Sequence, residues 1–147
     1  MRIVVAVTGK DQIESFLKNL GEKLEIEVPQ ASAEQLGERL PRLIRRKMES
    51  SDFGVSQDGT PALVEDGGYS RSWKAEVTGE AGSFTLVVSP QGTDENGIEY
   101  AKLGEMLELG TRQHAAIPHV DVLNAAATKM GMDVVKRQTR RVLREMK

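Results

Sequence analysis

The chain has 147 residues and a formal net charge of −2, and 39% of its residues are hydrophobic and 29% charged. This length and apolar content fit one domain, residues 1–147, whereas the absence of cysteine excludes a disulfide framework, thiolate metal sites and cysteine nucleophiles. The longest apolar run, Ile3 to Val7, has five residues where a membrane-spanning helix needs about 20, so we expect no contact with a membrane.

The first third of the chain predicts one strand followed by helices. Residues 2–8 are rich in β-branched side chains and predict a short strand. From Asp11 onward, apolar residues recur every three or four positions, which predicts an amphipathic helix that ends at Pro29. A second helical segment starts near Ser32, and we expect Pro41 to kink it or to divide it into two shorter helices.

The middle of the chain predicts a loop and a β-hairpin. Residues 51–68 contain four glycines and show little periodicity, which predicts a long loop that is functional or becomes ordered with a partner. Apolar and polar residues alternate on both sides of a turn between residues 69 and 89, which predicts an antiparallel hairpin. Residues 90–97 predict a second polar turn.

The last third predicts two helices. Residues 100–109 suit a short helix that stops at Gly110, where glycine can take the left-handed conformation that closes a helix. Asp121 is placed to cap a terminal helix of about 26 residues, roughly 39 Å long. A helix of that length should extend beyond the core of so small a domain. We therefore expect an α+β fold, with a helical N-terminal half and a small antiparallel sheet.

Charge is distributed unevenly along the chain. Residues 1–50 carry 9 basic and 8 acidic groups, residues 51–128 carry 4 and 12, and residues 129–147 carry 7 and 2. An acidic middle beside a basic tail favours contact between copies of the chain, because complementary potentials steer association. A solvated helix face would give the same charge pattern in the tail. The candidate contact residues of the tail are Arg137, Arg140, Arg141 and Arg144.

The sequence contains little that indicates catalysis. His114 and His119 lie five residues apart near Asp121, but their spacing matches no common metal motif, and two imidazoles in a loop are more often ordinary polar side chains. Glu105 and Glu108 lie on one helical face. This arrangement suits an acid–base pair, but an ordinary acidic surface has the same pattern. The glycine-rich stretches lack a nucleotide fingerprint. We expect no catalytic residues, no metal and no cofactor.

Two basic clusters leave nucleic-acid binding open. Neither cluster is interleaved with aromatic residues, and the pI of about 5.8 is low for a nucleic-acid-binding module. The clusters are Arg39, Arg42, Arg45, Arg46 and Lys47, and Lys136, Arg137, Arg140, Arg141, Arg144 and Lys147.

Two short motifs resemble a known family. The first reads Tyr-Ala, then Met-Leu-Glu-Leu-Gly-Thr, then Ala-Ile-Pro, between Tyr100 and Pro118. The second, Gly-x-Tyr-x-x-Ser-Trp, spans residues 67–73. Their order and spacing resemble the tail-completion, or neck, proteins of long-tailed bacteriophages and prophages, also described as minor tail or head-to-tail joining proteins. The resemblance covers roughly residues 31–130, and the strand at 2–8 is an addition to the family pattern.

The resemblance implies a structural rather than an enzymatic function. Such proteins form a ring, six-fold in the expected case, that completes the tail so that head and tail join around a channel for DNA. The implied partners are other copies of the chain, the portal-adaptor (connector) proteins, the tail terminator or tail-tube proteins, and passing genomic DNA without sequence specificity. The implied location is the virion neck, assembled in the cytoplasm of the bacterial host. A small nucleic-acid-binding regulator is the alternative, and a hydrolase using His114 or His119 is third.

The matched motif supplies the remaining candidate interface residues. These are Tyr100, Glu108, Gly110 and Thr111. Glu108 is suited to pair with an arginine of a neighbouring copy, Gly110 to permit a left-handed turn, and Thr111 to bond the local backbone. An equally good interpretation is that these three residues only terminate the helix. The loops at 51–68 and 90–97 are candidates for contact with neighbouring rings.

Overall fold

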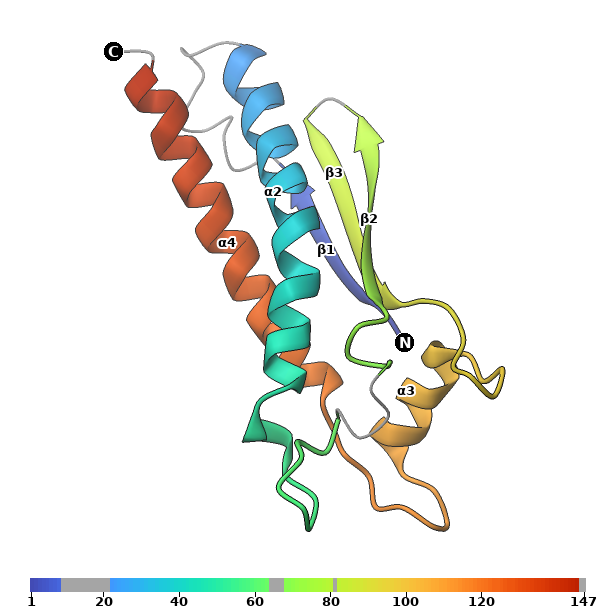
Figure 1. Ribbon diagram of the computed structural model, residues 1–147. Helices are drawn as coiled ribbons and strands as arrows, with labels where there is room; N and C mark the ends of the chain where they lie inside the picture. The colour runs from blue at the N-terminus through green and yellow to red at the C-terminus, as the bar shows by residue number, and fades with distance from the viewer. Residues whose placement is uncertain (9–21, 64–67, 81, 146–147) are drawn as a thin grey trace.

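The computed structural model describes residues 1–8, 22–63, 68–80 and 82–145, and it has the expected α+β fold (Figure 1). The elements in chain order are β1 (Ile3–Thr8), α2 (Glu22–Met48), the 3₁₀ helix η1 (Ser51–Phe53), β2 (Trp73–Glu80), β3 (Ser83–Pro90), α3 (Tyr100–Leu109) and α4 (Val120–Glu145). The predicted helix that starts at Asp11 lies outside the described residues as far as position 21.

The three strands form one antiparallel sheet in the order β1-β3-β2. The predicted strand at 2–8 and the predicted hairpin are both confirmed, although the hairpin begins at Trp73 rather than at residue 69. Residues 69–72 form a turn instead, in which both the backbone N–H and the hydroxyl of Ser72 donate to the carbonyl oxygen of Tyr69. On β3, Leu86 and Val88 are buried.

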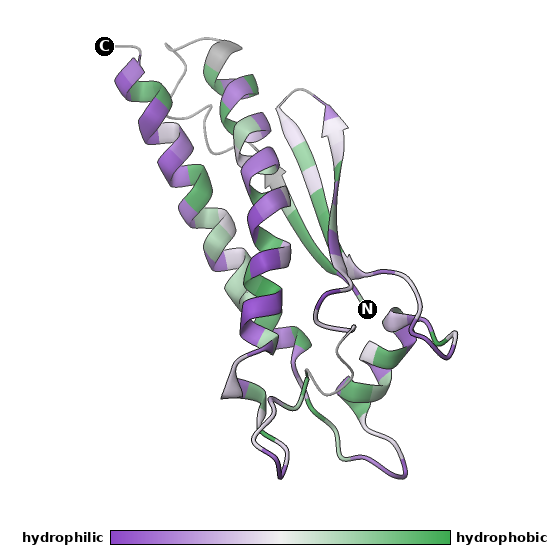
Figure 2. Cartoon of the chain, viewed as in Figure 1, coloured by the Kyte–Doolittle hydropathy of each residue, from purple (hydrophilic) through white to green (hydrophobic). Residues whose placement is uncertain are grey.

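Helices α2 and α4 lie side by side and antiparallel on one face of the sheet (Figure 1). Figure 2 shows hydrophilic and hydrophobic residues alternating along both helices, as expected for helices with one solvated face. The buried side chains between the helices and the sheet include Leu36, Leu40 and Ile44 of α2 and Leu123 and Val134 of α4. Each such burial contributes about 1.5–3 kcal/mol of transfer free energy, so this layer carries much of the stability.

The prediction that Pro29 ends a helix was wrong. Helix α2 is continuous from Glu22 to Met48 and contains Pro29 and Pro41, and Ser32 lies inside it rather than at a cap. A proline in a helix costs about 3 kcal/mol, through one lost hydrogen bond and a steric clash. Burial of one apolar side of α2 over its whole length offsets that cost.

We expected α4 to extend beyond the core, and its last turns do lie outside the main apolar cluster. The first turns of α2 accompany the last turns of α4, and Leu24 and Val28 pack against Val142 in a second apolar cluster. Gln138 Nε2 also donates to Gln35 Oε1 across the two helices at 3.1 Å. The predicted length of 26 residues is confirmed.

The predicted loops contain local structure. In the described part of 51–68, η1 is followed by a tight turn closed by a bridge between Val55 and Pro61. The turn after β3 is confirmed, with Asp94 Oδ1 accepting from the backbone N–H groups of Asn96 and Ile98. None of the helices described is both long enough and apolar enough to cross a bilayer.

Candidate functional site

The two motifs meet in one place, which we call the motif junction: Gly68, Tyr69, Tyr100, Gly104, Glu108 and His119. It joins the turn before β2, helix α3, the loop after α3 and the start of α4. In two places a tyrosine ring packs closely against a glycine. A Cβ atom on Gly68 would overlap the hydroxyl of Tyr100, and a Cβ atom on Gly104 would lie 2.6 Å from the hydroxyl oxygen of Tyr69. Glycine at both positions therefore lets two tyrosines pack directly on backbone.

His119 is buried at the centre of the junction and is hydrogen-bonded at both ring nitrogens. Its Nδ1 lies 2.7 Å from the carbonyl oxygen of Ile117 and 3.0 Å from Glu108 Oε2, and both of these oxygens are acceptors. Nδ1 therefore carries a proton, and in the neutral imidazole Nε2 accepts from the Tyr69 hydroxyl at 2.8 Å. Burial, and secondarily the charge of Glu108, raises the pKa of Tyr69 far above its ordinary value, so the phenol keeps its proton for this bond.

Glu108 caps helix α4, although it precedes Val120, the first residue of that helix, by 12 positions in the sequence. Its Oε2 accepts from the backbone N–H groups of His119 at 2.7 Å and Val120 at 3.1 Å. A carboxylate at this position satisfies two N–H groups at the helix start and faces the positive end of the helix dipole. The predicted cap, Asp121, lies instead in the first turn of the helix. Pairing of Glu108 with an arginine of another copy stays a prediction, because the contacts described here are within the chain.

The loop after α3 turns at Gly110 and Thr111. Gly110 has φ +77°, and its N–H donates to the Met106 carbonyl oxygen at 2.9 Å. A side chain there would meet the backbone of Ala116 at 2.8 Å, so both the dihedral angle and the space require glycine. Thr111 Oγ1 accepts from the N–H of His114 at 3.1 Å, as expected for a residue that bonds its local backbone.

The two histidines have separate environments. His114 is exposed beside an apolar hollow of about 530 Å³ that also includes Leu103 and Ile117, whereas His119 is enclosed in the junction. Within the described ranges, no group of three His, Asp or Glu side chains is arranged to hold a metal ion. His119 connects the turn before β2 with α3 through its contacts with Tyr69 and Glu108.

The eight predicted interface residues fall into two groups. Tyr100, Glu108, Gly110 and Thr111 belong to or border the motif junction. The remaining four form an arginine cluster, Arg137, Arg140, Arg141 and Arg144, which lines a hollow of about 380 Å³ near the end of α4. The two groups lie at opposite ends of the molecule (Figure 1). Only Arg141 of the cluster has a described ion-pair partner, Glu145 at 3.7 Å, and both side chains are more than half exposed.

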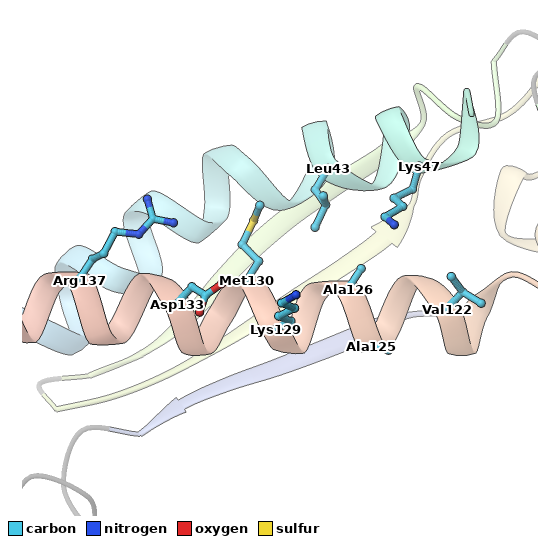
Figure 3. A pocket seen from close by; sticks show the side chains of 9 residues that line it. All are labelled: Leu43, Lys47, Val122, Ala125, Ala126, Lys129, Met130, Asp133 and Arg137. Atoms are coloured by element: carbon cyan, nitrogen blue, oxygen red, sulfur yellow. The ribbon is translucent and has the colours of Figure 1, made fainter. Parts of the chain in front are cut away.

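The sequence did not indicate a third feature, which we call the interhelical groove. It is a hollow of about 500 Å³ between α2 and α4. Leu43 and Met130 extend from opposite helices into it, and Lys47, Lys129 and Arg137 lie along it (Figure 3). Lys47 and Arg137 belong to the two basic clusters, but only the pairing of α2 with α4 brings them to one surface.

No protein-family model, curated protein or solved structure matches this chain.

Proposed function

We propose that this chain is a structural assembly protein of a tailed phage or prophage. It forms a ring at the head-to-tail interface, completes the tail, and leaves a channel through which DNA passes without sequence-specific contact. Its partners are further copies of itself, the portal-adaptor proteins on one side and the tail terminator or tail-tube proteins on the other. It has no catalytic function, and it resides in the neck of the virion.

The convergence of the two motifs carries this proposal. Residues 68–73 and 100–118 are far apart in the sequence, yet Tyr100 packs on Gly68 and Tyr69 packs on Gly104. His119 links the two segments further, because it is hydrogen-bonded to Tyr69 and lies 3.0 Å from Glu108. The polar groups of the junction are used to fix α3 and α4 relative to each other. A motif of this kind positions surfaces, as a subunit of a ring requires.

The arrangement of loops and charge also supports assembly. The loop after α2, the turn after β3 and the loop before α4 all lie in the half of the molecule opposite the C-terminus (Figure 1). The arginine cluster lies at the other end. Complementary charge at separate places on one chain favours contact between copies.

Deleting the coding sequence from the genome that carries it tests the proposal. We expect induced cells to accumulate DNA-filled heads and separate tails, visible by negative-stain electron microscopy, and a plasmid copy to restore joined particles. Joined, infectious particles in the deletion strain would refute the proposed function.

A small nucleic-acid-binding regulator is the second candidate, because four arginines line a single hollow on α4. Such a protein would release counterions on binding, so its affinity for duplex DNA would fall steeply and log-linearly with salt. A neck subunit should bind free duplex weakly at every salt concentration. A salt titration of DNA affinity therefore separates the two candidates.

A further inference from the structure

The interhelical groove combines an apolar surface with a cationic border. Leu43 and Met130 are only partly buried, and Val122 at one end of the groove is 48% exposed. The basic side chains along the groove are Lys47, Lys129 and Arg137, against a single carboxylate, Asp133. Figure 3 shows Lys47 and Arg137 reaching from opposite helices toward the space between them. A partner for this groove needs apolar side chains flanked by negative charge.

Helix α3 presents such a surface on the same chain. We call it the α3 outer face: Lys102, Glu105, Met106 and Leu109, which are all exposed and follow the i, i+3, i+4, i+7 spacing of one helical stripe. Leu109 is 79% exposed and Met106 is 40% exposed, so two large apolar side chains are left in water.

The surroundings of the α3 outer face are acidic. Residues 91–109 contain five carboxylates and one lysine, a net charge of −4. The carboxylates are Asp94, Glu95, Glu99, Glu105 and Glu108. Glu108 is engaged in the motif junction and Asp94 accepts backbone N–H bonds within its own turn, which leaves three exposed carboxylates, Glu95, Glu99 and Glu105. The groove, with three cations and one anion, carries the opposite sign.

We infer that the α3 outer face of one copy docks into the interhelical groove of the next copy. Leu109 and Met106 enter the groove against Leu43 and Met130, and Glu105 faces the basic side chains along it. The inference rests on the proposed function, because it supplies the contact by which copies form a ring. Charge complementarity between two surfaces of the same chain identifies a second copy as the occupant.

The geometry of this contact is directional. The groove lies between α2 and α4, whereas α3 packs elsewhere on the molecule, beyond the end of the sheet (Figure 1). Contact between two different surfaces is heterologous, so each copy keeps one surface free for the next copy. Successive copies close into a ring when the rotation between neighbours divides a full turn. Apolar docking of a helix face into a groove is a common recognition mode.

A charge-exchange experiment tests the inference in the full chain. Sedimentation velocity over a concentration series measures association of the wild type, of Glu105→Lys, of Lys129→Glu, and of the protein that carries both changes. We expect each single reversal to weaken association by about tenfold or more, and the double variant to regain most of it, because opposite charges again face each other. Leu109→Asp should also weaken association by at least that much.

Two variants serve as matched controls. Glu38→Lys makes the same charge change at an exposed position of α2 that lies outside the groove and outside the acidic middle. Met132→Asp makes the same kind of apolar-to-acidic change at a 56% exposed position of α4 outside the groove. Both should associate like the wild type. Circular dichroism should show every variant folded, since all these side chains are exposed.

Each outcome decides between the possibilities. A wild type that is monomeric at every attainable concentration, or single reversals that associate normally, would overturn the inference. If copies associate but all variants behave alike, the ring uses other surfaces, and the proposed function survives. If the deletion strain described above still makes joined particles, the proposed function fails, whatever the sedimentation shows.

Discussion

Glu108 is the residue that ties the last turn of α3 to the start of α4. We predict that Glu108→Ala lowers the free energy of unfolding by about 1–2 kcal/mol, because two backbone N–H groups at the helix start lose their acceptor. Urea denaturation measures the change. Glu105→Ala is the matched control, since Glu105 is exposed on the same helix and should change stability by less than about 0.5 kcal/mol. Equal effects at the two positions would contradict the capping role.

Because of Tyr69, the free energy of unfolding should depend on pH in the alkaline range. Its pKa is raised in the folded protein by burial and then by the charge of Glu108, whereas in the unfolded chain it titrates near its ordinary value of 10.0. Below pH 10 the phenol is protonated in both states, so its contribution to stability is constant. Above pH 10 the unfolded state releases the proton first, and the free energy of unfolding falls by about 1.4 kcal/mol per pH unit.

The Tyr69→Phe variant isolates this contribution. We predict that the wild type loses about 1.4 kcal/mol more than the variant between pH 8 and pH 11, measured by urea denaturation at both values. At pH 8 the variant should itself be about 1 kcal/mol less stable, because Nε2 of His119 loses its hydrogen-bond partner. Parallel pH profiles for the two proteins would show that Tyr69 is not protected in the fold.

The docking of α3 gives a prediction at the scale of the element. Gly104→Ala places a Cβ atom 2.6 Å from the Tyr69 hydroxyl oxygen and 3.0 Å from two ring carbons, and the buried ring has little room to move. We predict a loss of about 1–3 kcal/mol, although alanine is the better helix former by about 1 kcal/mol. Thermal or urea unfolding measures the difference.

Gly37→Ala in α2 is the matched control for this prediction. The added Cβ atom would lie 3.5 Å from Val77 Cγ2, which is ordinary van der Waals contact. This variant should therefore gain about 0.5–1 kcal/mol from helix propensity. If both glycine variants were stabilised, the close approach of Tyr69 to α3 would be wrong.

The elements also show what could be predicted from the sequence. The β-branched composition was sufficient for β1, and local periodicity was sufficient for the hairpin, α3 and α4. The continuity of α2 through Pro29 and Pro41 was not predictable in this way, since burial against the sheet and α4 outweighs the cost of the prolines. The cap of α4 was missed for a similar reason: Glu108 reaches it only through the tertiary fold, and Asp121 was the nearest local candidate.

At the scale of the whole molecule, the candidate surfaces depend on how the elements are brought together. The interhelical groove exists only because α2 and α4 run antiparallel side by side, and the motif junction exists only because α3 packs on the turn before β2. The sequence identified the arginines and the motif residues by type and position. It contained no local signal that Lys47 of α2 and Lys129 of α4 share one surface.

The arginine cluster distinguishes assembly from DNA binding. Arg140, Arg141 and Arg144 lie in the cluster but outside the groove, so changing all three to glutamate leaves the proposed α3 contact in place. If the cluster meets the acidic middle of a neighbouring subunit, the triple variant should remain a folded protein but fail to form rings, as judged by sedimentation and electron microscopy.

The same variant gives a different result if the cluster binds nucleic acid. Ring formation would then be unchanged, while the affinity for duplex DNA would fall. The dependence of that affinity on salt would also become shallower, in proportion to the number of phosphates that the three arginines neutralise. The free energy of unfolding should change little in either case, because the three arginines are exposed. The ion pair between Arg141 and Glu145 is also at the surface and contributes less than about 1 kcal/mol. Loss of rings with unchanged DNA affinity would assign the cluster to contact between subunits, and loss of DNA affinity with intact rings would assign it to the genome that passes through them.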